Sequence, residues 1–178
     1  HDILHVYEGL ADRYGLWDAA NIMMEWCSDD GFIDFRAWLI AQGKEVYLSA
    51  LKDPDTLADI EPYGNCCFES LSYVGDDAYR QLTGQDAYEN ADPAARKKWK
   101  AILGADIVYR EDICFPRPRR ALPAAYPRLC AKYGGAERFD TDDIGWNTGS
   151  KDVRSLLERG KEYDLEKKLS RKKGGEGR

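Results

Sequence analysis

The chain has 178 residues, and roughly two thirds of the surface of an unfolded chain of this length can be buried on folding, which allows one domain with a sizeable core. Hydrophobic residues make up 43% of the chain, but no apolar run approaches the roughly 20 residues that a membrane-spanning helix needs. The net charge of −6 combines an acidic body with a basic segment from residue 151 onward, so we expect basic protein partners rather than nucleic acid, whose phosphates an acidic body repels.

The first residues, HDILHVYEGL, lack the basic start, apolar middle and small-residue cleavage site of a secretory signal, so export by that route is not indicated. Five cysteines at irregular spacing predict buried free thiols in a reducing cytoplasm rather than a disulfide framework. C-x-x-C elements are absent, and two histidines are too few for a structural zinc site. We therefore expect a cytoplasmic protein with no metal and no other cofactor.

In the first third of the chain, apolar residues recur at the spacing of helices rather than of strands, which predicts two helices separated near Gly15. The next apolar run follows the same spacing over residues 32–46. Gly43 marks the point where one helix ends before another begins at Lys44.

Two Asp-Pro pairs predict the starts of further helices, because aspartate caps a helix N-terminus and proline suits the first helical position. They are Asp53–Pro54 and Asp92–Pro93. Between them, the apolar pattern over residues 68–83 predicts two short helices, separated at Gly75–Asp76 and closed at Thr83–Gly84.

After residue 106 the character of the sequence changes. Residues 107–109 favour an isolated extended piece, and four closely spaced prolines then predict an ordered wrapping loop, followed by a short helix over residues 124–134. Residues 151–178 predict a charged, mobile tail, either helical or disordered, because few apolar positions remain to be buried.

These patterns predict an all-α fold: a compact bundle of short helices forming one domain over residues 1–150, followed by the tail. The core is expected to contain Trp17, Met23, Trp26, Phe32, Phe35, Trp38, Leu39, Tyr47 and Trp99.

The stretch EWCSDDGFIDFRAW, residues 25–38, concentrates acids and aromatics around Gly31. Residues 28–30 precede an apolar run, so their side-chain oxygens are expected to accept hydrogen bonds from the N–H groups of the first helical turn, with Gly31 as the bend. Asp34 is then placed in the first turn, where a negative charge suits the helix dipole.

The same stretch supplies the candidate functional residues. Its acids could converge as oxygen ligands or act as acid and base, although their spacing is not that of a calcium loop. The candidate catalytic residues are Asp29, Asp30 and Glu25, and the candidate binding residues are Trp26, Asp29, Asp30, Asp34, Arg36, Trp38, Arg117 and Arg119.

Three basic features remain. Arg36 is expected to pair with Asp29 or Asp30, or to bind an anionic ligand. The arginines and aromatics of residues 115–128 could hold phosphate or stack on bases, or could pair with neighbouring acids. His1 and His5 have the spacing by which two helical histidines share a metal, but no third ligand accompanies them in the sequence.

A resemblance to a known family rests on Trp17-Asp18-Ala19-Ala20, Cys27-Ser28-Asp29-Asp30-Gly31-Phe32, Phe35-Arg36, Trp38-Leu39-Ile40, Gly43, Asp53-Pro54 and Leu57-Ala58. With these residues, the stretch from Trp17 to Ile60 resembles a bacterial family known as domain-of-unknown-function family 4240. Weaker likeness continues through CFESLSYVGDDAYRQLTG and in LPAAYPRLCAKYG, where Cys130 stands in place of an expected tryptophan. The resemblance implies a mostly helical intracellular domain, with no established activity and no catalytic residue. Members usually have a further helix ahead of YEGLADRYGLWDAA, and a basic tail is not typical of them.

Three functions are compatible with these observations. The first is a cytoplasmic interaction module, such as an immunity or regulatory protein, with an acidic, aromatic-lined groove near residues 25–36 that receives a protein partner. The second is an enzyme that uses Asp or Glu as acid and base on an anionic small substrate. The third is nucleic-acid binding through the arginine-rich segment and the tail.

Overall fold

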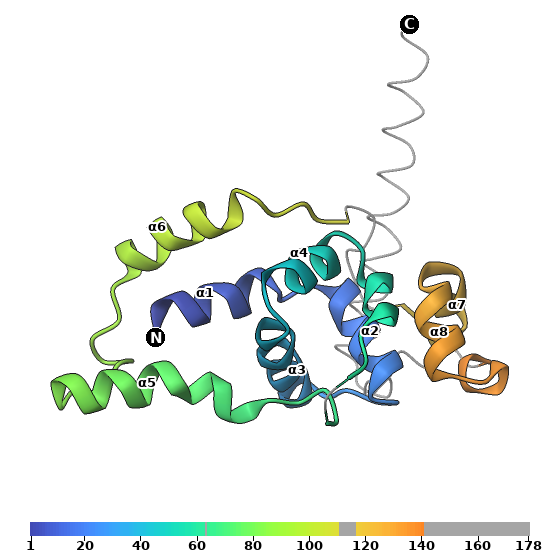
Figure 1. The fold of residues 1–178 in the computed structure, drawn as a ribbon, viewed down its shortest axis with the longest axis horizontal. Coiled ribbons are helices and arrows are strands. Elements are labelled where there is room, and N and C mark those ends of the chain that lie inside the picture. The colour runs from blue at the N-terminus through green and yellow to red at the C-terminus, as the bar shows by residue number, and fades with distance from the viewer. Residues whose placement is uncertain (63, 111–116, 141–178) are drawn as a thin grey trace, which may run out of the picture.

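The computed structural model describes residues 1–62, 64–110 and 117–140, and the regular structure within these ranges is helical, without a strand (Figure 1). The all-α prediction is therefore confirmed. Residues 111–116 of the predicted wrapping loop and the tail 151–178 lie outside the described residues. Over the described ranges, none of the helices has the length and apolar character that crossing a membrane would require.

The first four helices follow the predicted order. They are α1 (Asp2–Leu10), α2 (Tyr14–Met23), α3 (Asp29–Ala41) and α4 (Lys44–Lys52). Gly43 separates the last two with a φ of 92°, a left-handed conformation that glycine adopts without steric cost.

Both Asp-Pro pairs begin helices, as predicted. The 3-10 helix η1 (Pro54–Asp59) follows Asp53, whose carboxylate accepts a hydrogen bond from the backbone N–H of Asp55 at 3.1 Å. Helix α6 (Pro93–Gly104) follows Asp92, whose carboxylate accepts one from the N–H of Ala94 at 2.8 Å.

The prediction of a break at Gly75–Asp76 is wrong, because α5 (Glu69–Thr83) runs through both residues as one helix. Gly75 serves a different purpose: a Cβ at this position would lie 2.5 Å from the backbone nitrogen of His1. Glycine therefore allows the start of α1 to approach the side of α5. The predicted end of the segment is confirmed by Gly84, which has a φ of 71°.

Residues 124–134 do not form one helix. The chain passes through η2 (Arg119–Ala121), α7 (Leu122–Ala125), α8 (Pro127–Tyr133) and η3 (Ala136–Phe139). Tyr126 interrupts the helix because the following proline disfavours helical backbone in the residue before it. The expected extended piece at residues 107–109 has no regular structure.

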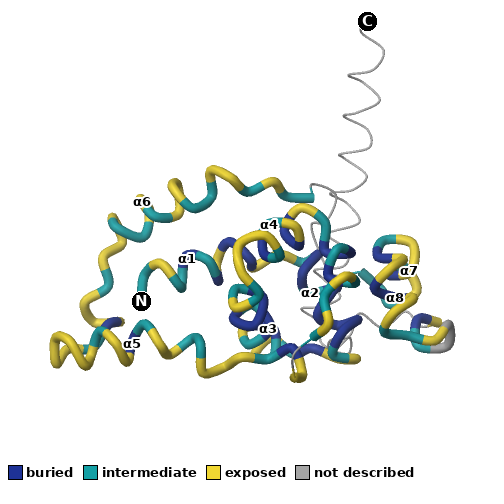
Figure 2. The backbone as a smooth tube through the Cα atoms, viewed as in Figure 1, coloured by how far each residue is buried: buried dark blue, intermediate teal, exposed yellow. Residues whose placement is uncertain are grey.

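The core lies among α2, α3, α4, η1, α7 and α8, whereas α5 and α6 are mostly exposed (Figure 2). In Figure 1, α5 and α6 flank α1 on opposite sides, away from α7 and α8. Among the expected core residues, the following are buried: Met23, Phe32, Phe35, Trp38, Leu39 and Tyr47; Trp17 is partly buried against them.

Two expected core tryptophans lie elsewhere. Helix α2 ends at Met23, and the turn that follows passes through Glu25 at a φ of 67°, which carries Trp26 to the surface with 56% exposure. Trp99 is half-buried outside the core, because α6 packs against α1 and contributes no buried residue.

The prediction of free, buried thiols is confirmed where the structure describes them. Cys27, Cys66 and Cys130 are buried and free, and Cys67 is half-buried and free. Burial raises the pKa of the Cys27 thiol to about 12, so this thiol is protonated and unreactive at neutral pH.

Candidate functional site

The start of α3 differs from the predicted capping arrangement. Ser28 alone is the N-cap, and its hydroxyl accepts a hydrogen bond from the backbone N–H of Gly31 at 3.0 Å. Asp29 and Asp30 already lie in the first helical turn, and Gly31 is helical rather than a bend. Asp34 consequently lies in the second turn, so its predicted position in the first turn is wrong.

The candidate catalytic acids do not form a site. Glu25, Asp29 and Asp30 are all exposed, and none of them lines the polar cleft described below. Acid–base chemistry needs two carboxylates in different environments that face one pocket. The arrangement of these three acids gives no support to that chemistry.

The two candidate tryptophans have different environments. Trp38 is 2% exposed, and its ring centroid lies 5.3 Å from that of Phe35 in the core. A side chain buried in this way cannot contact a partner, which corrects the prediction of Trp38 as a binding residue. Trp26 is exposed and remains available for binding.

Arg117 is part of a buried polar network rather than an open phosphate site. Its backbone N–H donates to one carboxylate oxygen of Asp18 at 3.2 Å, and its guanidinium lies 3.5 Å from the other. The hydroxyl of Tyr126 donates to the same carboxylate at 3.1 Å. Burial raises the pKa of Asp18 from 3.8 to about 7, against the opposing effect of these donors.

The other predicted arginines also contact the body of the protein. Arg119 donates to the backbone carbonyl of Glu25 at 2.7 Å. Arg36 does not pair with either acid of the first turn of α3. Its guanidinium instead lies 3.6 Å from the Asp12 carboxylate and donates to the backbone carbonyl of Glu8 at 3.2 Å.

A polar cleft of about 410 Å³ lies where α1, α3 and α5 meet. Two predicted binding residues, Asp34 and Arg36, form its α3 wall together with Ile33. The remaining lining residues come from α1, α5 and the loop after α5: His5, Glu8, Gly9, Glu69, Ser72, Tyr73 and Tyr88.

The cleft is acidic because carboxylates gather in it. Burial, followed by the negative charges of Glu69 and Asp30, raises the pKa of Asp34 above its ordinary value of 3.8. The hydroxyl of Tyr73 lies 3.3 Å from the Glu69 carboxylate, whose charge raises the pKa of Tyr73 above 10. Among the described residues, no hydrogen bond or ion pair reaches the Asp34 carboxylate.

Glu8 joins two walls of the cleft and is only 8% exposed. One carboxylate oxygen accepts a hydrogen bond from the Ser72 hydroxyl of α5 at 2.9 Å. The other lies 2.9 Å from Nδ1 of His5, one turn earlier on α1. These two bonds hold the His5 ring in one orientation.

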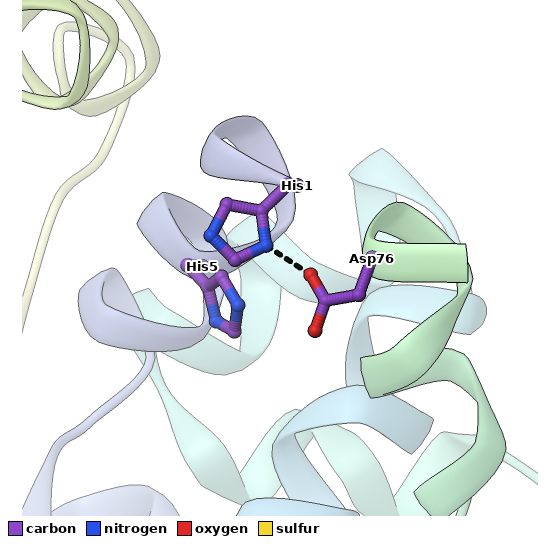
Figure 3. Close-up of side chains that lie close together, drawn as sticks. All are labelled: His1, His5 and Asp76. Carbon is purple, nitrogen blue, oxygen red and sulfur yellow. Dashed lines mark hydrogen bonds and ion pairs between the residues drawn. The ribbon is translucent and has the colours of Figure 1, made fainter. Parts of the chain in front are cut away.

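Figure 3 shows that His5 of α1 belongs to a cluster with His1, the residue that precedes α1, and with Asp76 of α5. One ligand atom from each of the three residues lies within 4.8 Å of the others. Nδ1 of His1 contacts Oδ1 of Asp76. The ring of Tyr88 packs edge-on against His1, with centroids 4.8 Å apart.

The sequence pattern found the two histidines but not their third partner. Asp76 lies 75 residues after His1, and the expected helix break at Gly75–Asp76 concealed its place on a continuous helix. Glu8, Glu69, Tyr73 and Tyr88 were also missed as site residues. The i, i+3 spacing of His5 and Glu8 on one helical face was the signal available for one of them.

Residues 1–81 match the family model described as "Protein of unknown function (DUF4240)". The segment LPAAYPRLCAKYG, which we expected to resemble a later part of that family, lies outside the matched residues. No curated protein and no solved structure matches the chain. The match includes α1 to α4 and α5 up to residue 81, so the part of the chain that is similar to this family contains the three helices that form the cleft.

Proposed function

We propose that this protein is an interaction module whose α1–α3–α5 cleft receives a positively charged side chain of a partner protein. The observation that carries the proposal is the pair Asp34 and Glu69, two carboxylates that line one cleft. No cation of the described residues pairs with either of them. A lysine or arginine from a partner would supply the missing positive charge.

The one cationic side chain that the described residues place in this cleft does not neutralise the pair. The Arg36 guanidinium is bound to the backbone carbonyl of Glu8 and lies beside the carboxylate of Asp12. Arg36 therefore shapes the cleft while leaving its field negative.

Two tyrosine rings strengthen the attraction for a cation. Tyr73 is 51% exposed and Tyr88 is 59% exposed, and both line the cleft. The face of an aromatic ring attracts lysine and arginine by about 0.5–1 kcal/mol at exposed sites. An immunity or regulatory role toward a basic protein fits this combination of carboxylates and tyrosines.

An oligo-arginine peptide titrated into the full chain by calorimetry tests the proposal. The double variant Asp34→Asn, Glu69→Gln should bind the peptide on the order of fivefold more weakly, because two exposed charge pairs contribute together about 1 kcal/mol. Nuclear magnetic resonance shifts caused by the peptide should concentrate at α1, α3 and α5.

A second double variant controls for the change in net charge. Glu45 and Asp77 are exposed acids outside the cleft, so Glu45→Gln, Asp77→Asn should leave peptide affinity close to that of the unaltered chain. Equal weakening by both double variants would show attraction to net charge alone and would reject the cleft as the binding site.

A further inference from the structure

We propose that His1, His5 and Asp76 bind a divalent transition-metal ion of the zinc class. The geometry is the first support: one ligand atom from each residue lies within 4.8 Å of the others (Figure 3). Ligand atoms on a tetrahedral zinc ion, each about 2.0–2.1 Å from the metal, lie about 3.3–3.4 Å apart. The three ligand atoms would have to shift to that spacing when an ion binds.

The second support is the protonation state imposed on His5. Its Nδ1 lies 2.9 Å from the Glu8 carboxylate, which can only accept a hydrogen bond when ionised, so the ring proton lies on Nδ1. Nε2 then carries the lone pair that a metal requires. This atom is buried, and no described residue donates a hydrogen bond to it.

This arrangement matches the way in which proteins prepare metal-binding histidines. A carboxylate behind the imidazole fixes its orientation and increases its basicity as a ligand. Glu8 is itself held by the Ser72 hydroxyl at 2.9 Å, so the supporting carboxylate is fixed as well. An unpartnered buried nitrogen without a ligand would cost free energy, whereas a bound metal would satisfy it.

Asp76 and His1 complete the donor set. Asp76 is 8% exposed, and its Oδ1 contacts Nδ1 of His1, so these two atoms share one proton without metal. For an ion to bind Nδ1 of His1, the proton on that nitrogen must move to Nε2, which leaves the lone pair of Nδ1 for the metal.

Arg96 opposes this change in His1. Its Nη2 lies 2.6 Å from Nε2 of His1 and donates to it, which places the ring proton on Nδ1. Metal binding through Nδ1 moves that proton to Nε2, and Arg96 must then turn toward Asp2, which its Nε already contacts at 2.6 Å. Removing the guanidinium should consequently make metal binding tighter.

The donor types select the metal. Two imidazoles and one carboxylate suit Zn²⁺ and Co²⁺, whereas Mg²⁺ and Ca²⁺ prefer sites built from oxygen ligands. Three protein ligands also leave a coordination position for water or for a group from a partner. Because His5 lines the acidic cleft, the site adjoins the surface assigned to the partner.

Titration of the full chain with Co²⁺ and Zn²⁺, followed by visible absorption and calorimetry, tests this site. We expect one ion per chain, intense d–d absorption from four-coordinate Co²⁺, and no competition from Mg²⁺. His5→Gln and Asp76→Asn should each weaken Zn²⁺ binding about tenfold or more, and Glu8→Gln should also weaken it, by about tenfold. Arg96→Met should strengthen it.

Asp77→Asn is the matched control for Asp76→Asn, because this exposed neighbour on α5 lies outside the cluster and should leave Zn²⁺ affinity unchanged. Circular dichroism confirms that each variant is folded, and the absorption spectrum of the unaltered chain gives a result that needs no variant. Absence of four-coordinate Co²⁺, sulfur-to-cobalt charge transfer from the cysteines, or unchanged affinity in His5→Gln and Asp76→Asn would each overturn the proposal. The oligo-arginine titration is independent of these results, so either proposal can fail alone.

Discussion

The carboxylate of Asp18 on α2 accepts a hydrogen bond from the hydroxyl of Tyr126, which lies 108 residues later in the chain and 3.1 Å away. Arg117 donates to the same carboxylate from its backbone N–H, at 3.2 Å. Asp18 is 1% exposed and Tyr126 is fully buried, so this network joins α2 to the segment that carries α7 and α8.

Removing the Asp18 carboxylate should be strongly destabilising. Asp18→Ala removes the buried acceptor of the Tyr126 hydroxyl and of the Arg117 backbone N–H, and we expect a loss of about 3–5 kcal/mol in the free energy of unfolding. Asp18→Asn keeps an acceptor oxygen and should cost about 1–2 kcal/mol. Chemical denaturation monitored by circular dichroism measures both, and equal losses would show that the hydrogen bonds do not matter.

Asp18 should also give the stability a defined pH dependence. Burial raises the pKa of Asp18 from 3.8 to about 7, so between these values the folded state holds a proton that the unfolded state has released. The free energy of unfolding should therefore fall as the pH rises from about 4 to 7. Asp18→Asn has no such proton, so a slope that persists unchanged in this variant would argue against the assignment.

Substitution of Gly75 tests the close approach of α1 and α5. Glycine to alanine inside a helix ordinarily adds about 1 kcal/mol of stability, but a Cβ here would lie 2.5 Å from the backbone nitrogen of His1. Gly75→Ala should therefore lower the melting temperature, because the start of α1 must move away. Gly104→Ala is the control: its Cβ would lie 3.6 Å from Leu10, an ordinary contact, and should not lower stability. Equal effects from the two variants would contradict the proposed approach.

The sequence predicted the elements whose ends depend on local chemistry. Asp53 and Asp92 cap helices through their own side chains, and Gly43 adopts a conformation that favours glycine wherever it occurs. The role of Gly75 was predicted wrongly because glycine is needed there for a tertiary contact with His1, and no local sequence pattern indicates such a contact. A glycine that packs two helices together and a glycine that ends one look the same in sequence.

The candidate site was predictable only along a single helix. Asp34 and Arg36 lie two residues apart on α3 and were found together, yet the cleft also needs Glu8 from α1 and Glu69 from α5. Trp38 was misassigned because an aromatic ring beside acids suggests binding, whereas its helical face decides its burial. Pairings between distant helices depend on packing that the sequence pattern does not specify.

Ser28 should account for most of the capping energy at the start of α3. Ser28→Ala removes the acceptor for the Gly31 N–H and should cost about 1 kcal/mol. Asp30→Asn removes only a favourable charge at the helix N-terminus and should cost about 0.3–0.5 kcal/mol. Ser49→Ala is the control, since Ser49 lies exposed within α4 and alanine is the better helix former. A larger loss of stability from Asp30→Asn than from Ser28→Ala would show that the aspartates, rather than Ser28, cap the helix.

The stability of an Asp34 variant distinguishes a binding role of this carboxylate from a structural role. Burial and the charges of Glu69 and Asp30 raise its pKa above 3.8, so its ionised form is disfavoured in the folded state. Asp34→Asn should therefore raise the free energy of unfolding at pH 7 by about 0.5 kcal/mol or less, while weakening binding of the oligo-arginine peptide.

The difference in stability between Asp34→Asn and the unaltered protein should depend on pH. Below 3.8 the carboxyl is protonated in both the folded and the unfolded chain, so Asp34→Asn and the unaltered protein should be similarly stable. As the pH rises through the raised pKa, the unaltered protein acquires the repulsion and the variant becomes the more stable of the two. Denaturant midpoints of both proteins, measured across this pH range, test the prediction. If Asp34→Asn lost stability at pH 7, Asp34 would have a structural role. A carboxylate that stabilises the fold has no need of a partner's positive charge.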